Sequence, residues 1–313
     1  MLSFLTAIHR PTLNALIDGD LAYQVVHKAD INERARKMRD EAPYQIAGIY
    51  YIVLADKCGL SPSTTVLMQV YDLLLHYMEE TEDMDPQYYA AFEDLDSFKH
   101  RGLPKKWKSK WRKHLMKMSA DPNNRGQQKF QISSTRKRKL ETFLNNLDGI
   151  LQQIPEADRD KPFPYPLRDV GFSSDMPRCY KQHVTHLSTN WLMALLDAAI
   201  NVTVRRNNGL DNNEMPYPMM YIVLGFLWSP IHASLAEFSL TRLASAYSDK
   251  SGVGLNTHPA GRSVGFPHDE AESEDDRNAA FEAAAAFSYT NCALYDRNEK
   301  EEKVNFPRVK PHI

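Results

Sequence analysis

Several features that define common protein classes are scarce or missing in this chain of 313 residues. Its three cysteines, Cys58, Cys179 and Cys292, are too few for a disulfide framework, so we expect a reducing, intracellular setting. No signal peptide is evident at the start, and the most apolar stretch, residues 219–231, is too short to span a bilayer. These absences predict a soluble protein with no membrane partner.

Familiar catalytic motifs are missing as well. The sequence contains no zinc-binding spacing, no Walker A loop, no G-x-S-x-G elbow and no internal repeat. Its content of 42% hydrophobic and 25% charged residues is ordinary for a globular protein, which excludes a wholly disordered, collagen-like or coiled-coil chain. The length leaves room for one or two domains with a sizeable core.

The hydrophobic pattern predicts an α/β fold, in which short strands are separated by helices. Short β-rich runs predict strands at residues 45–55, 167–173 and 221–228. Apolar residues at spacings of three and four predict helices over much of the remainder. The helix after the first strand is expected to have Ser61 as its cap and Pro62 at its first position.

This pattern divides the chain into four parts. Residues 1–43 form an N-terminal helical extension, and the sheet-bearing domain combines residues 44–56 with 166–262. Residues 57–165 form a helical and basic insertion, whose helices either pack on the sheet or make a separate unit. Residues 263–313 form a tail that is acidic, then helical, and partly mobile.

Positive charge is concentrated in residues 99–139, which hold 15 lysines and arginines and a single acidic residue. Because phosphates attract such charge and bases stack on tryptophan, this segment predicts binding of DNA or RNA. The predicted contact residues are Lys105, Lys106, Trp107, Lys108, Lys110, Trp111, Arg112, Lys113, Arg136, Lys137, Arg138 and Lys139. The run 136–139 is also typical of nuclear import, which favours a nuclear location. The alternative is an internal partner, because the acidic segment 79–96 could fold back and neutralise this charge.

Four segments that are far apart in the sequence occur in a particular order. Gly48-Ile-Tyr-Tyr-Ile52 lies on the first strand, and residues 169–183 run from the second strand through a turn into a helix. Glu237 lies on the helix after the third strand, and Gly254-Leu-Asn256 follows that helix. Over residues 44–56 and 166–262, this order resembles the GIY-YIG nuclease domain. The resemblance implies a small mixed three-stranded sheet flanked by helices, here with a large, mostly helical insertion.

The resemblance implies a site that hydrolyses phosphodiesters. Tyr50 matches the first-motif tyrosine and His183 the histidine of the helix, while Glu237 matches the glutamate that holds Mg²⁺ (or Mn²⁺) in this family. Tyrosine there serves proton transfer or water positioning, and an arginine stabilises charge. Asn256 matches the late asparagine of the family, and His258 shares its Gly/Pro-containing loop.

Two positions depart from the family. Asp169 stands where the second-motif tyrosine is expected, and Cys179 stands at the arginine position, with Arg178 one residue earlier. A cysteine lacks the fixed charge and forked donors of arginine. With Arg178 included as the candidate replacement, the implied catalytic residues are Tyr50, Arg178, His183 and Glu237, and the departures predict weakened or lost activity.

Three functional hypotheses remain open at this stage. The first is a nuclease-derived, nucleic-acid-associated protein, which is a GIY-YIG-type endonuclease if it is active. The second is a catalytically inactive module that binds nucleic acid or a protein partner through the basic insertion. The third is a helical interaction protein whose motif matches are chance, and it predicts that residues 44–56 and 167–173 do not pair as strands.

Overall fold

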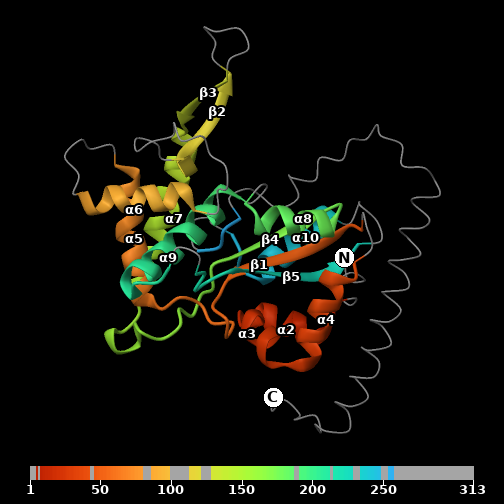
Figure 1. Cartoon of the computed structure of the whole chain (residues 1–313). Helices are drawn as coiled ribbons and strands as arrows, with labels where there is room; N and C mark the ends of the chain where they lie inside the picture. The colour runs from red at the N-terminus through yellow and green to blue at the C-terminus, as the bar shows by residue number, and fades with distance from the viewer. Residues whose placement is uncertain are drawn as a thin grey trace, which may run out of the picture.

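The computed structural model describes residues 5, 8–42, 46–79, 86–98, 113–120, 128–186, 190–211, 214–227, 233–247 and 253–256. These residues form a mixed α/β fold in which helices surround a small antiparallel sheet (Figure 1). The expected C-terminal tail, residues 263–313, lies outside the described residues and stays a prediction. Among the described helices, none is long and apolar enough to cross a membrane.

The three-stranded sheet has β1 in its centre, between β4 on one side and β5 on the other. These strands span Gly48–Leu54, Arg168–Ser173 and Met219–Phe226, so the three predicted strands are confirmed. The expectation of a mixed sheet is wrong, because β1 pairs antiparallel with both neighbours. Apolar patterning identifies a strand but not its direction, which the long connections between these strands leave open.

β1 is buried along its whole length, as its run of aromatic and β-branched residues predicts. Successive side chains of a strand point to opposite faces, so β1 contributes to two cores. Tyr50 and Ile52 pack in one core, and Ile49 and Tyr51 pack in the other. The sheet is therefore covered by helices on both faces.

The N-terminal extension covers one face of the sheet together with a helix from the other end of the described chain. The helices that share this core are α2 (Arg10–Asp18), α3 (Leu21–His27), α4 (Ala29–Asp40) and α10 (Ala233–Leu243). α2 ends at Gly19, whose φ of 83° is left-handed and suits a glycine that lets the chain turn directly into α3. The predicted helical character of residues 1–43 is confirmed where the structure describes it.

The insertion packs against the other face and shares its core with the sheet. Its helices are α5 (Thr64–Met78), α6 (Pro86–Ser97) and α7 (Ser134–Leu151), with the short turns η1 (Lys113–Leu115) and η2 (Glu156–Asp158). α5 and α6 contact α9 (Trp191–Asn208), which follows α8 (Met176–Val184). The insertion helices therefore extend the sheet's own core, which answers the question left open by the sequence.

The start of α5 differs from the prediction. Its cap is Ser63, whose hydroxyl accepts the Val66 N–H at 3.3 Å, and the helix begins at residue 64. The carbonyl of Pro62 instead accepts the Phe163 N–H at 2.9 Å, so residues 61–63 belong to an extended connection. Both serines are chemically suited to capping, and this tertiary contact selects the later one.

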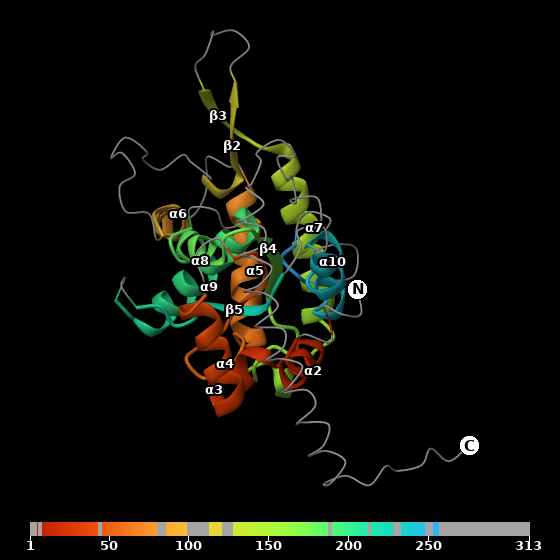
Figure 2. The ribbon, with the colours of Figure 1, turned by 90° about the vertical axis from the view of Figure 1, so that its right-hand side faces the viewer.

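The insertion also contains a hairpin that the mostly helical prediction missed. Strands β2 (Met116–Ala120) and β3 (Gln128–Ile132) pair antiparallel and project away from the body of the protein (Figures 1 and 2). Each strand is only five residues long and contains a lysine, so its alternation of apolar and polar residues is a weak signal within a strongly basic segment.

Candidate active site on the central sheet

The centre of the site is a tyrosine that lies across a glycine of the neighbouring strand. Tyr50 on β1 is opposite Gly171 on β4. A Cβ atom placed on Gly171 would lie 2.3 Å from the Tyr50 hydroxyl oxygen, so only glycine leaves room for this ring. The ring is thereby directed toward α8, where His183 Nε2 lies 3.1 Å from the Tyr50 hydroxyl.

α8 begins directly after β4, and its start sets which residues face the sheet. Asp175 caps the helix by accepting the Arg178 N–H at 3.1 Å, and Pro177 lies in the first turn. Cys179 and His183 are four residues apart, so they lie on one face and are buried. Arg178 is exposed, because successive helical residues point about 100° apart. The structure therefore does not bring this predicted catalytic residue to Tyr50.

The Tyr50–His183 pair consists of two neutral groups at pH 7. Burial, with a smaller contribution from the nearby His186, lowers the pKa of His183 to about 4. Burial also raises the pKa of Tyr50 well above its usual value, and the neighbouring Cys179 and Asp169 add to this shift. The imidazole can exchange a proton with the phenol, but with a pKa of about 4 it is a weak general base at neutral pH.

A thiol and a second tyrosine fill the space beside this pair. The Cys179 thiol is within hydrogen-bonding contact of the Ser173, Tyr221 and Tyr50 side chains, and burial raises its pKa. Tyr221 from β5 stacks on Tyr50, with ring centroids 5.1 Å apart. A protonated thiol carries no charge, so the position that the resemblance gives to arginine holds a neutral, packed side chain.

Two buried carboxyl groups form the other half of the site. Asp169 is 6% exposed and Glu237 is 4% exposed, so both carboxyl groups are buried. Burial and the nearby charge of Glu237 raise the pKa of Asp169 to about 7, and the Val170 N–H partly opposes this. These two carboxyl groups, Asp169 and Glu237, are called the acid pair below. Both also raise the pKa of Tyr50, so the ionisation of the acid pair and that of the tyrosine are coupled.

The acid pair suits the hard cation that the resemblance implies. Mg²⁺ and Mn²⁺ prefer oxygen ligands, and a cation between Asp169 and Glu237 would offset the repulsion of two buried carboxylates. Within the described residues, no group of three histidine, cysteine, aspartate or glutamate side chains is placed to hold a metal ion. The fitting donors are therefore these two carboxylates, together with water and phosphate oxygens.

Asn256 has a structural contact that explains its place beside the site. Its side-chain amide pairs with the outer edge of β4, accepting the Val170 N–H at 3.0 Å and donating to the Val170 carbonyl at 2.7 Å. The Leu255 N–H donates to the Arg168 carbonyl at 2.8 Å, so this segment acts like a short additional strand. His258, the other residue predicted in this loop, lies outside the described residues.

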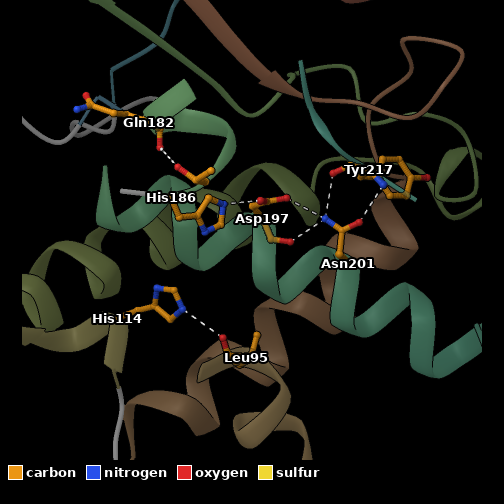
Figure 3. Close-up of polar contacts among 8 residues, drawn as sticks. Leu95, His114, Gln182, His186, Asp197, Asn201 and Tyr217 are labelled. Carbon is orange, nitrogen blue, oxygen red and sulfur yellow. Dashed lines mark hydrogen bonds and ion pairs between the residues drawn. The ribbon is translucent and has the colours of Figure 1, made fainter. Parts of the chain in front are cut away.

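A second buried polar network supports α8 and was not predicted from the sequence (Figure 3). His186 Nε2 lies 2.7 Å from an Asp197 carboxylate oxygen on α9, and both side chains are almost fully buried. Asn201 donates to Asp197 Oδ1 at 2.9 Å and accepts the Tyr217 N–H at 2.9 Å. The network thus joins the end of α8 to α9 and to the chain entering β5. The available signal was Asp197 and Asn201, four residues apart in the otherwise apolar stretch 191–202 of α9.

The described part of the predicted nucleic-acid surface has two structural anchors. Lys113 Nζ donates to the Asp96 carbonyl at 3.0 Å, and burial lowers the pKa of this lysine to about 8. Arg136 donates to the carbonyls of His114 and Met116 at 3.0 and 2.5 Å. Asp96 belongs to the acidic segment, so that segment does meet the basic one at Lys113. The predicted contacts from residues 105–112 lie outside the described residues.

The remaining basic positions lie at the start of α7. Arg138 is exposed, and Lys137 and Lys139 are half-buried. Arg138 is therefore the exposed cation of this group, whereas backbone carbonyls hold Lys113 and Arg136.

The comparisons with known proteins return no relative. None of the family models matches the chain, and neither a curated protein nor a solved structure matches it. The functional proposal therefore depends on the residues of the site and their geometry.

Proposed function

We propose that this chain is a nuclease-derived, nucleic-acid-associated protein whose phosphodiester-cleaving centre is weakened or lost. The observation that carries this proposal is the identity of the residue that α8 places beside Tyr50 and on the face of His183. This residue is the neutral, buried Cys179, whereas the neighbouring Arg178 is exposed. Without a fixed cation, charge that develops on a phosphoryl group loses a stabilising contact, and loss of one such contact reduces rates by about 10²–10³-fold.

The pairing of β1 with β4 supports descent from a GIY-YIG-like domain. Residues 48–53 pair with residues 168–173, so the two motif segments lie side by side despite the long insertion between them. The hypothesis of a helical protein with chance matches expected these segments to remain unpaired. The contact of Tyr50 with His183 is a further arrangement that an accidental match does not require.

The charge of the insertion supports association with nucleic acid. Lys137, Arg138 and Lys139 follow one another in the second turn of α7, and Arg138 is exposed. A phosphate backbone would neutralise this concentration of positive charge.

The residues of the acid pair define what cleavage would require. Glu237 and Asp169 would hold the Mg²⁺ or Mn²⁺ ion, which supplies charge stabilisation to phosphate oxygens when bound. Tyr50 and His183 would position water and move its proton. His183 is a weak base, which limits the rate of that step.

The proposal is tested by measuring cleavage and binding on the same preparation of the full chain. Single-stranded, duplex and branched DNA and RNA are each incubated with Mg²⁺ or Mn²⁺, with Glu237→Gln as the matched variant. We expect salt-sensitive binding, with cleavage that is absent or slow and is abolished by Glu237→Gln. Rapid cleavage that Glu237→Gln leaves unchanged would contradict the assigned site. The absence of binding to every nucleic acid would contradict the proposed function and favour a protein partner.

A second candidate, an active endonuclease, is favoured by the acid pair alone. A carboxyl group whose pKa is about 7 beside a second buried carboxyl group is a costly arrangement that a bound cation would relieve. Cleavage at a rate comparable to that of ordinary nucleases, lost with Glu237→Gln, would favour this candidate over the first.

A further inference from the structure

The helix α8 has an inner face that meets the core and an outer face that is exposed. Cys179 and His183 lie on the inner face and are buried. Arg178, Lys181 and Thr185 recur at spacings of three and four, so they lie together on the opposite side, and each of them is exposed. These three residues define the outer face of α8.

The outer face carries two positive charges and no negative one. α8 itself contains no aspartate or glutamate. Among the described residues, no carboxylate forms an ion pair with Arg178 or Lys181. Helical residues three positions apart are neighbours, with Cβ atoms about 5–6 Å apart, so these two like charges repel each other. An anionic partner would relieve that repulsion.

The stability of the helix accounts for one of these cations and not for the other. Lys181 lies in the last turn of α8, where the helix dipole favours positive charge. Arg178 is the third residue of the helix, in the first turn, where the dipole disfavours it. Asp175 accepts the backbone N–H of Arg178 at 3.1 Å and so serves as the cap of the helix. The position of the Arg178 guanidinium therefore has no explanation within the helix.

A neighbouring arginine shows how a charge is satisfied within the chain. Arg39 on α4 forms an ion pair with Asp40, with its Nε atom 2.8 Å from a carboxylate oxygen. Its guanidinium carbon also lies 5.7 Å from the centroid of the Tyr180 ring of α8. These contacts account for Arg39, whereas the two cations of the outer face remain exposed.

We infer that the outer face of α8 binds the phosphate backbone of nucleic acid through Arg178 and Lys181. This inference rests on the proposed association with nucleic acid and adds a contact on the sheet-bearing domain to the exposed Arg138 of the insertion. A polymeric anion can contact separate parts of the surface at once, and each phosphate that is neutralised adds to affinity. Arg178 thereby positions nucleic acid from outside the buried centre instead of stabilising charge at Tyr50.

The test measures the affinity of the full chain for labelled duplex DNA by fluorescence anisotropy between about 50 and 200 mM salt. The variant Arg178→Gln/Lys181→Gln removes both charges of the outer face. Lys28→Gln/Lys57→Gln is the matched control, because both lysines are exposed and neither lies on α8. Lys28 precedes α4 at the end away from Arg39, and Lys57 follows β1. Arg178→Lys keeps the charge at the first of the two positions.

We expect the outer-face variant to lower the slope of log affinity against log salt by about 1.8, or about 0.9 for each lost phosphate contact. The ratio of wild-type to variant affinity should then fall about 12-fold between 50 and 200 mM salt. The loss should be the same on unrelated DNA sequences, because phosphate contacts carry no base information. The control and Arg178→Lys should keep the wild-type slope.

A folding defect is separable from a lost contact. One substitution removes an unfavourable interaction with the helix dipole and the other removes a favourable one, so the outer-face variant should keep the Tm of the wild type. A wild-type slope with this variant, or an equal loss with the control, would overturn the inference while the proposed function stands.

Two further outcomes concern the partner. The absence of binding to every nucleic acid in the wild-type chain would overturn both the inference and the proposed function. Labelled poly-L-glutamate serves as the probe for an acidic protein partner. Tighter binding of this polymer than of DNA, lost in the outer-face variant, would assign the face to an acidic protein and overturn the inference.

Discussion

Replacing Asp169 by asparagine should raise the free energy of unfolding relative to that of the wild type, and this gain should be larger at pH 8 than at pH 5. The buried Asp169 carboxyl group has a pKa of about 7, raised first by desolvation and then by Glu237, against 3.8 in the unfolded chain. Asparagine has nearly the same shape, its oxygen can still accept a hydrogen bond, and it cannot ionise. The substitution therefore removes the charge and little else.

The sign and magnitude follow from the two pKa values. Between pH 3.8 and about 7, folded Asp169 keeps its proton while the unfolded chain releases it, so the wild type loses stability as the pH rises through this window. One pKa unit corresponds to 1.36 kcal/mol, and about two units of the window lie above pH 5. The free energy of unfolding of Asp169→Asn minus that of the wild type should therefore increase by about 2.5 kcal/mol from pH 5 to pH 8.

Histidine titration does not obscure this difference. The pKa of His183 is lowered to about 4, so its contribution to stability is lost as the pH falls from 6.5 toward 4, opposite to the effect of Asp169. Because His183 is present in both chains, its contribution cancels when the two are subtracted at the same pH.

Urea unfolding at pH 5 and pH 8, with equal slopes for both chains, provides the measurement. Asp72→Asn is the control, because Asp72 is an exposed carboxylate on α5 and its removal should change stability by less than about 0.5 kcal/mol. A difference between Asp169→Asn and wild type that is equal at both pH values would refute the argument. It would show that the carboxyl group is not held in its protonated form by burial and by Glu237.

Three further predictions concern the packing and the ion at this site. Gly171→Ala places a methyl group against the Tyr50 ring and should destabilise the protein by about 1–3 kcal/mol in urea unfolding, whereas Gly149→Ala, with open space around it, should not destabilise it. Asn256→Ala leaves both backbone groups of Val170 without this partner, and an increased rate of amide exchange at Val170 with a loss of about 1–3 kcal/mol is expected. Millimolar Mn²⁺ should raise the Tm of the wild type but not of Glu237→Gln, by preferential binding to the folded state, and equal shifts would argue against a site at the acid pair.

The parts of the fold that follow local rules were predictable from the sequence. The β-rich run at residues 45–55 predicted a strand, and β1 is a strand that is buried along its whole length. The hairpin was missed because its five-residue strands carry a weak alternating pattern within a strongly basic segment. The cap at Ser63 was missed because it depends on the contact of Pro62 with Phe163, a residue far away in the sequence.

The composition of the site was harder to predict, because it depends on side chains from separate elements. The Tyr50–Tyr221 stack joins β1 to β5, and His186 with Asp197 joins the end of α8 to α9. No local periodicity encodes which distant residues become neighbours. Cys179, rather than Arg178, shares a helix face with His183, because Cys179 and His183 are four residues apart.

The residues proposed for cleavage and those proposed for nucleic-acid binding differ in how exposed their side chains are. Cleavage needs a phosphate to reach Tyr50 and His183, and these residues are 8% and 5% exposed, with Cys179 and Tyr221 packed beside them. Binding needs exposed charge, which the described part of the insertion carries at Arg138. Under the proposed function, a substitution that packs the Tyr50 centre more tightly stabilises the sheet on which the insertion is built, so it can remove cleavage without weakening binding. The proposal therefore assigns the buried centre to support and the exposed charge at the start of α7 to binding.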